Sequence, residues 1–177
     1  MDFVFPDKNE EEFIKVAEYL GIEQLCFLYT CDFRQNSERL KGIKTKIGLK
    51  SGAYCDGRTA RRAKKHVDIV VSEGDVRKLL SNSSVDVVIG AENDEGPDYM
   101  HHRNSGLNHV ICRIAHEKNK AIGFSFSRLL NSRRRALLLG RIRQNIKLCR
   151  KYKAETVSAS FAKKPMEMRA DYRCLFQ

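Results

Sequence analysis

No stretch of this 177-residue sequence approaches the roughly 20 consecutive apolar residues that a membrane-spanning helix requires. The first seven residues lack the basic-then-apolar pattern of a secretory signal, and no Cys-x-x-Cys pair marks a zinc ribbon or a thioredoxin-like site. No linker or low-complexity tract divides the chain. We therefore expect residues 1–177 to form one domain of a cytoplasmic protein, with its six cysteines as ordinary buried or half-buried thiols.

The loops that commonly bind phosphate or carry a nucleophile are also missing: no GxxxxGK, GxGxxG or GxSxG sequence occurs. One His/Cys set has a spacing able to hold a metal, because His109, Cys112 and His116 fall within about 60° of one another on a helix. The apolar residues of this segment lie on the opposite face: Leu107, Val110, Ile111 and Ile114. The His/Cys stripe is therefore predicted to face solvent, whereas a catalytic metal needs a sheltered site. We expect neither metal nor catalytic residue in the protein.

Charge is distributed unevenly along the chain, which has a net charge of +11. Residues 1–38 carry 3 basic and 9 acidic side chains, and residues 67–110 carry 3 and 8. Residues 39–66 carry 10 basic and 1 acidic side chains, and residues 111–177 carry 17 basic and 4 acidic ones. Two basic blocks that alternate with mildly acidic segments are typical of a protein with a polyanion-binding surface. A solvated surface with a high isoelectric point explains the same charge counts. No basic helix has the large aromatic residues that favour binding to an anionic membrane.

The two basic blocks differ in character. Residues 39–65 form a Lys/Arg-rich strand and loop region whose glycines permit close backbone approach, while its charges suit phosphates without reading a sequence. The second block contains a long predicted helix with one basic face: Arg143, Lys147, Arg150 and Lys151. Three arginines at 133–135 open this helix, where they oppose the helix dipole, so a bound anion would offset their placement. A solvated face remains the simpler alternative.

Helical and strand patterns alternate along the sequence. Strands are predicted at residues 2–5, 24–30, 46–49, 67–71, 85–90, 121–126 and 156–161. Helices are predicted at residues 10–20, 59–65, 75–80, 105–118 and 133–153, and a last one opens at Pro165 and is still running at residues 174–176. This rhythm indicates an α/β fold with parallel strands and right-handed crossovers, which a barrel and a doubly wound sheet both satisfy.

The run DYMHHRNSGLNHV at 98–110, followed by AIGFSF at 121–126 and the leucine pair at 129–130, resembles the archaeal ribonuclease P protein component 3 family. The eukaryotic counterpart of that family is the 30-kilodalton subunit of ribonuclease P and ribonuclease MRP. The long Arg/Leu helix and PMEMR at 165–169 follow in the order of the family. The resemblance extends over nearly the whole chain and is most specific between residues 85 and 130.

For the fold, the resemblance implies a TIM-like barrel of about seven parallel strands, related to the polymerase-and-histidinol-phosphatase superfamily. Enzymes of that superfamily open with a His-x-His pair on the first strand, whereas this chain reads DFVFP at 2–6. The missing pair argues against hydrolysis by the protein itself. The chain is also shorter than the roughly 250 residues of full eight-unit barrels, so we expect an incomplete barrel with a covered open edge and a natural or imposed truncation at its end.

For the function, the resemblance implies a non-catalytic subunit that binds ribonuclease P RNA and a companion, ferredoxin-like protein subunit. The RNA would remove the 5′ leader from precursor tRNA with magnesium, and the protein would hold no cofactor. The side chains that we expect to meet RNA or the partner are Lys50, Arg61, Arg62, Arg103, His109, Arg133, Arg134, Arg143 and Arg169. Ser105 and Asn108 belong to the run at 98–110, the signature run of the resemblance, and could instead form a turn and a helix cap.

Two other functions remain open on the sequence. A metal-dependent phosphoesterase of the same superfamily would draw its ligands from acids and histidines near strand ends: Asp68, Glu73, Glu92, Asp98, His101 and His102. A basic scaffold that binds only proteins would use its charge for solubility. Metal at the carboxyl ends of the strands would favour the enzyme, and absent or salt-insensitive RNA binding would favour the scaffold.

Overall fold

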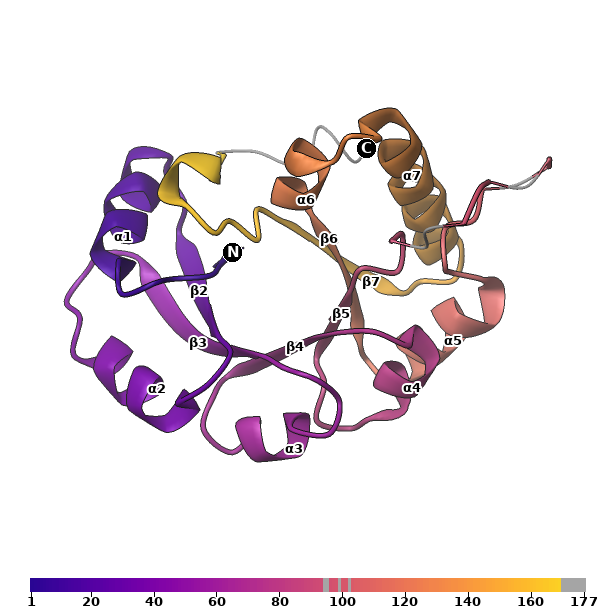
Figure 1. The fold of residues 1–177 in the computed structure, drawn as a ribbon. Helices are drawn as coiled ribbons and strands as arrows, with labels where there is room; N and C mark the ends of the chain where they lie inside the picture. Colours follow the sequence, from indigo (N-terminus) through magenta and orange to yellow (C-terminus); the bar gives the residue numbers. More distant parts are fainter. Residues whose placement is uncertain (94–95, 99, 102, 170–177) are drawn as a thin grey trace.

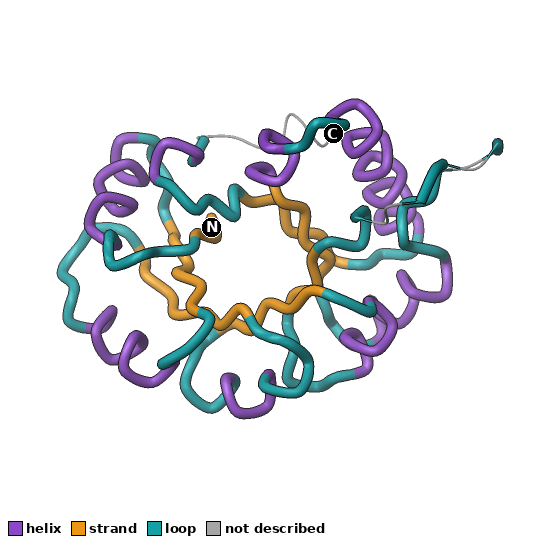
Figure 2. The backbone as a smooth tube through the Cα atoms, in the orientation of Figure 1, coloured by secondary structure: helices purple, strands orange, loops and turns teal. Residues whose placement is uncertain are grey.

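The computed structural model describes residues 1–93, 96–98, 100–101 and 103–169, and its seven strands are parallel and follow one another around a single sheet (Figure 1). The strands are β1 (Asp2–Val4), β2 (Gln24–Tyr29), β3 (Gly48–Tyr54), β4 (Ile69–Glu73), β5 (Val87–Ile89), β6 (Ala121–Ser125) and β7 (Glu155–Ala159). Figure 2 shows them as an inner ring enclosed by helices. The predicted α/β barrel of about seven parallel strands is confirmed.

The outer ring consists of helices that follow the strands along the chain. They are α1 (Glu10–Tyr19), α2 (Phe33–Lys41), α3 (Ala60–Ala63), α4 (Val76–Ser81), α5 (His109–Glu117), α6 (Phe126–Asn131), α7 (Arg135–Lys151) and the 3-10 turn η1 (Pro165–Glu167). None of the helices in the described part of the chain is both long and apolar enough to cross a membrane.

The two ends of the sheet meet through a side chain. A single backbone bridge joins Val4 to Ala162, and the Phe5 amide donates to the Ala162 carbonyl at 2.8 Å. Beside this bridge, the buried Asp2 carboxylate accepts the Ser160 amide at 2.6 Å and the Ser160 hydroxyl at 2.7 Å. The carboxylate therefore replaces the missing ladder of backbone hydrogen bonds and closes the ring.

Apolar residues fill both sides of the strand ring. Inside it, Phe3 of β1 stacks on Phe161, which follows β7, with ring centroids 5.3 Å apart. Outside it, one cluster packs the first strands against α1 and α2, and a larger one packs the later strands against α3 to α7. Near-continuous apolar strands such as LCFLY in β2 are required because both faces of a barrel strand are buried.

Several element predictions were wrong for identifiable reasons. Helix α2 was missed because its buried positions are few and partly polar, Ser37 and Leu40. Helix α6 was missed because it follows β6 directly, without a turn residue between them. Strand β3 begins and ends later than predicted, and its small residues Ser51, Gly52 and Ala53 gave no apolar signal. The turn that opens at Pro165 ends at Glu167, while residues 174–176 lie outside the described part.

The cysteine prediction holds for four of the five described cysteines, of which Cys26, Cys112 and Cys149 are buried and Cys55 is half-buried. Cys31 is exposed, and Cys174 lies outside the described residues. All five are free thiols.

The closure predicts that Asp2→Ala destabilises the protein by about 2 kcal/mol, because the buried Ser160 amide loses its acceptor and the Ser160 hydroxyl keeps only the Phe3 carbonyl at 3.1 Å. Urea unfolding followed by circular dichroism measures this difference. The matched substitution Asp7→Ala, at an exposed site, should change the free energy of unfolding by less than about 0.5 kcal/mol. Equal effects of the two substitutions would show that the carboxylate does not hold the ring closed.

Candidate functional site

The carboxyl ends of the strands carry a partly buried ion-pair network. Arg128, two residues into α6, donates two hydrogen bonds to the Glu73 carboxylate at the end of β4, at 2.9 and 2.7 Å. Tyr54 at the end of β3 donates its hydroxyl to the same carboxylate at 2.7 Å, and Asn93 donates its side-chain amide at 3.0 Å. Four strand ends thus converge on one carboxylate whose two oxygens both accept hydrogen bonds from protein donors.

This network fixes the charges of its members. Burial alone would raise the pKa of Glu73, but the hydrogen bonds from Arg128 and Tyr54 outweigh it and lower the pKa below the ordinary value. Burial and the Glu73 hydrogen bond raise the pKa of Tyr54 to about 12. Glu73 is therefore ionised and Tyr54 is a neutral donor across the physiological range.

Glu92, which follows β5 and lines the same mouth, has a different environment. Its side chain is 1% exposed, and its Oε2 atom has no hydrogen-bond partner among the described residues. Burial raises the pKa of this carboxyl to about 7, while the charge of Arg128 opposes the shift. Glu92 is thus a buried acid that changes its charge near neutral pH.

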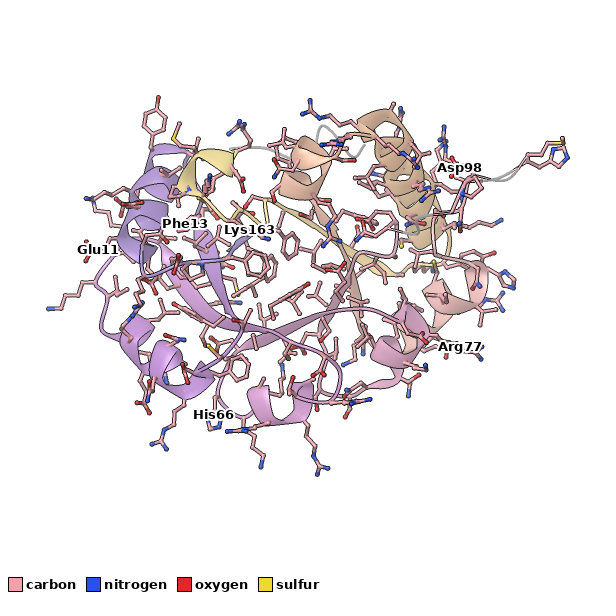
Figure 3. All side chains as sticks on the ribbon, viewed as in Figure 1. Glu11, Phe13, His66, Arg77, Asp98 and Lys163 are labelled. Atoms are coloured by element: carbon pink, nitrogen blue, oxygen red, sulfur yellow. The ribbon has the colours of Figure 1, made fainter. Side chains whose placement is uncertain are left out.

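The loop after Glu92 is anchored to α7 by a buried arginine. Arg141 is 2% exposed and donates to the Asp98 carboxylate at 2.9 Å and to the Gly96 carbonyl at 2.6 Å. The Asp98 carboxylate also accepts the Asn104 amide at 3.1 Å. Figure 3 shows Asp98 beside α7. The hydrogen bonds and charge of Arg141 lower the pKa of Asp98 against the effect of its desolvation.

Arg103 of the signature run lies flat against the same helix. Its guanidinium pairs with Asp98 at 3.1 Å, and a Cβ atom at Gly140 of α7 would come within 2.4 Å of the guanidinium carbon. Glycine at 140 therefore makes room for this close approach. The Arg103 amide and carbonyl also bind the side chain of Gln144. Arg103 is half-exposed, so its outer edge remains accessible while its position is fixed.

Ser105, Gly106 and Asn108 have structural roles. Ser105 is buried and accepts the Gln144 amide at 2.9 Å, and its carbonyl accepts Asn145 at 2.7 Å. Gly106 has φ +74°, and a Cβ there would collide with the Ala91 carbonyl. Asn108 caps α5 by accepting the Ile111 amide at 2.9 Å. The turn-and-cap interpretation of Ser105 and Asn108 is the one that the structure supports.

The outer surface of α5 and α7 is cationic over its whole length. Arg143 and Lys147 are exposed one turn apart and line a shallow cavity of about 430 Å³ together with Arg103. Further along, Arg113 and Lys151 lie 5.6 and 5.7 Å from the centre of the Tyr152 ring. His109 lies 6.3 Å from that ring. No acidic residue occurs between Glu117 and Glu155 in the sequence, so nothing acidic on α7 neutralises this face.

The remaining predicted contact residues are dispersed. Arg61 and Arg62 are exposed on α3, across the ring from α7 (Figure 1). Lys50 is half-buried on β3 and pairs in register with Cys26, away from both arginine groups. Arg133 is exposed just before α7, and Arg134 lines the mouth of the barrel.

Arg169 has a local role at the end of the described chain. Its guanidinium donates to the carbonyls of Met166 and Met168, both at 2.7 Å, next to η1. Since η1 packs against α1, the structure does not bring Arg169 together with the α5–α7 face.

The predicted solvent-facing His/Cys stripe on α5 was partly wrong. His109 and His116 are exposed, but Cys112 is fully buried and contacts Cys149 of α7, whereas Val110 is 42% exposed. The small side chains of Cys112 and Ala115 form the closely packed inner face of the helix. The sequence pattern placed the buried face of α5 on its larger apolar residues. Ile111 and Ile114 lie only at the margins of the face that is buried, which is centred on Cys112 and Ala115.

The acids and histidines of the phosphoesterase hypothesis do not form one ligand set. Asp68 precedes β4 and accepts Ser51 at 2.8 Å, at the opposite end of the strand from Glu73. Asp98 is held by arginines, His101 is exposed on the loop, and His102 lies outside the described residues. Among described residues, no group of three His, Cys, Asp or Glu side chains is placed to hold a metal ion. The described acids and histidines of this hypothesis are therefore not gathered around one point.

Sequence reasoning missed Arg128 and Arg141. A signal for Arg141 existed, because it lies three residues after the buried Leu138 and four before the buried Asn145, on the inner face of α7. An arginine at such a position requires an acid or carbonyl partner. Arg128 had a weaker signal, as the first cation after an entirely buried strand.

The raised pKa of Glu92 predicts a specific pH dependence. Its pKa is near 4.5 in the unfolded chain and about 7 when folded, so its protonated form contributes stability that is full below about pH 4.5 and is lost as pH rises through 7. Glu92→Gln should remove this dependence, leaving the variant more stable than the parent at pH 8 by at most about 3 kcal/mol and similar at pH 4.5. Urea unfolding of both proteins from pH 4.5 to 8 measures the difference. A difference that does not change with pH would contradict the assignment.

No family model matches the sequence. Ribonuclease P protein component 3 of Methanosarcina barkeri is 33% identical over 178 residues, covering 97% of this chain and 59% of the relative. The chain spans less than two thirds of the length of the curated relatives that it matches.

Two solved structures have the same fold. A chain from the cryo-EM structure of archaeal ribonuclease P with mature tRNA superposes with a TM-score of 0.76 at 25% identity, covering 95% of this chain and 76% of that one. Histidinol phosphate phosphatase from Lactococcus lactis superposes with a TM-score of 0.61 at 14% identity, covering 99% and 91%, and shows the fold alone. The resemblance indicated by the sequence is therefore confirmed: this chain is a homologue of archaeal ribonuclease P protein component 3 over almost its whole length.

Proposed function

We propose that this chain is a protein subunit of ribonuclease P that binds the catalytic RNA and supports removal of the 5′ leader from precursor tRNA. The observation that carries the proposal is the cationic α5–α7 face, which adjoins the signature loop and has no acidic residue on α7. Arginine and lysine side chains on such a face neutralise phosphates and position a nucleic acid without reading its bases.

In this proposal the chemistry belongs to the RNA and its magnesium ions, and the protein is not catalytic. The support comes from the barrel mouth, where Arg128, Tyr54 and Asn93 occupy both oxygens of Glu73. A carboxylate in that state is a poor metal ligand, because binding a metal would first require breaking a bidentate ion pair.

The proposal includes a companion protein subunit of the ferredoxin-like class and precursor tRNA as the substrate of the assembly. One solved relative comes from an archaeal ribonuclease P complex with mature tRNA, which supports an assembly of this kind for the present chain. The fixed position of Arg103 between Asp98 and Gly140 suits a surface that presents a guanidinium to a rigid partner.

The proposal is tested by measuring 5′-leader cleavage by the cognate catalytic RNA and companion subunit, with and without this protein, at moderate magnesium. We expect stimulation by the protein and no cleavage by the protein alone. The double variant Arg143→Ala/Lys147→Ala should weaken RNA binding about tenfold or more and lower the slope of log affinity against log salt by roughly 1.5.

The control removes the same charge elsewhere. Lys8, before α1, and Lys15 of α1 are exposed and lie across the ring from α7 (Figure 1), and Lys8→Gln/Lys15→Ala should leave the RNA affinity within about twofold of the parent. Equal losses in the two double variants would mean that only net charge matters. No stimulation, or metal-dependent cleavage by the protein alone, would overturn the proposed function.

A further inference from the structure

A cavity of about 1100 Å³ occupies the carboxyl-terminal mouth of the barrel. Residues from widely separated parts of the chain line it, including Phe5 after β1, Glu92 after β5, Arg134 before α7 and Phe161 after β7. Its volume is at the upper end of the roughly 300–1,000 Å³ range of small-molecule sites, and its walls are mixed rather than apolar. Arg128, which lines one side of the cavity, is paired with Glu73, but this ion pair gives no reason for the cavity to exist.

Glu92 is the feature that points to a ligand. It lines the cavity, is 99% buried, and its Oε2 atom has no hydrogen-bond partner among the described residues. Buried polar atoms in native proteins almost always have a partner, so an exception on a cavity wall marks a place where a ligand donor fits. The required group is an N–H or O–H donor.

The cavity is also lined by two exposed cations and one exposed acid, Asp7. Arg134 and Lys163 line it, both are exposed, and neither takes part in an ion pair among the described residues. Figure 3 shows Lys163 on the segment that leaves β7, next to the ring of strands. These side chains suit a phosphate at the entrance, and they would repel the lysine or arginine of a protein partner.

Between the rim and Glu92 the walls include aromatic rings. Phe5 meets Tyr54 edge to face at 5.2 Å and lies 6.5 Å from Phe161, and all three line the cavity. Phe161 is 2% exposed because it stacks on Phe3, whereas Phe5 and Tyr54 are half-buried. A flat ring that enters the cavity can therefore pack against Phe5 and Tyr54.

We propose that this cavity binds one nucleotide, with the base inside donating an N–H to Glu92 Oε2 and the phosphate held at the rim by Arg134 and Lys163. The ring packs against Phe5 and Tyr54, which line the cavity and are half-buried. This site is separate from the α5–α7 face, and its biological ligand rests on the proposed function: an unpaired nucleotide splayed out of an RNA strand, the form in which proteins read RNA bases.

The first experiment uses the whole chain at pH 8, where Glu92 is ionised, and measures binding of adenosine 5′-monophosphate by calorimetry. Purine riboside 5′-monophosphate is the matched ligand, because it differs only in lacking the amino group that donates to Glu92. Inorganic phosphate tests the rim alone. We expect adenosine monophosphate to bind with Kd of about 0.1–1 mM and about tenfold more tightly than either comparison ligand.

Variants of the acid and the rim locate the two halves of the ligand. Glu92→Leu should reduce the affinity for adenosine monophosphate about tenfold, to that of the purine riboside compound, and Glu92→Gln should lie between them because an amide oxygen still accepts. Arg134→Ala/Lys163→Ala should weaken both nucleotides and phosphate alike. Circular dichroism confirms that each variant is folded. The comparison of adenosine monophosphate with the purine riboside compound on the parent protein tests the same hydrogen bond to Glu92 without a substitution.

The proposal is overturned if adenosine monophosphate does not bind at about 10 mM, if the two purine nucleotides bind equally to the parent, or if phosphate alone accounts for the affinity. Such a failure is distinct from failure of the proposed function. Arg143 and Lys147 do not line the cavity, so the dependence of leader cleavage on them is measured separately from nucleotide binding, and stimulation without nucleotide binding would remove the site and leave the subunit role intact.

Discussion

The buried Asp2 carboxylate holds together a barrel that has one strand fewer than the usual eight. Seven parallel strands leave β1 and β7 with only one backbone bridge between them, and Asp2 supplies the acceptors that Ser160 would otherwise find in a ladder. Because the ring closes, the carboxyl ends of all strands meet at one mouth. Glu73, Glu92 and Arg128 lie at or just after the ends of the neighbouring strands β4, β5 and β6. Closure adds the segments that follow β1 and β7, so that Phe5 and Phe161 line the same cavity as Glu92 and Arg128.

The mouth and the outer cationic face are connected by one loop. Asp98 accepts the buried Arg141 on one side and pairs with the half-exposed Arg103 on the other. The same acid therefore orders the segment that leaves the mouth and fixes an arginine on the surface. Net charge alone could not produce this arrangement, since Arg141 and Arg103 have equal charge but opposite exposure. Arg141 organises the protein, and Arg103 is available to a partner.

The positions of most strands and the general location of the charge were predictable, because β-branched and apolar runs define buried strands and the basic blocks are separated along the sequence. The order of the strands was not, since the same rhythm fits a barrel and a doubly wound sheet, and the barrel was implied by the family resemblance. The Asp2–Ser160 contact was not predictable, since its residues are 158 positions apart and neither belongs to a motif. Helix α5 was turned to the wrong face because Cys112 and Ala115 pack closely through small size, whereas a hydrophobic pattern weights the larger isoleucines. Arg141 was overlooked among eight other cations in residues 133–153, although its position relative to Leu138 places it on the inner face. Sequence patterns specify elements and faces, while pairings of buried charge depend on distances that only the folded chain defines.

The proposed function assigns the chemistry to an RNA catalyst and gives the mouth of this barrel no part in it. The most direct test replaces the ion pair with neutral side chains, Glu73→Gln/Arg128→Met, and measures the single-turnover rate constant of leader cleavage at saturating, folded protein. Replacing both partners of a partly buried ion pair is often tolerated by a fold, so the variant is a fair test of chemistry. The account predicts a rate constant within about threefold of the parent, because the RNA and its magnesium perform the reaction. A loss of about 100-fold or more at saturation would show that these side chains act in the reaction and would contradict the account.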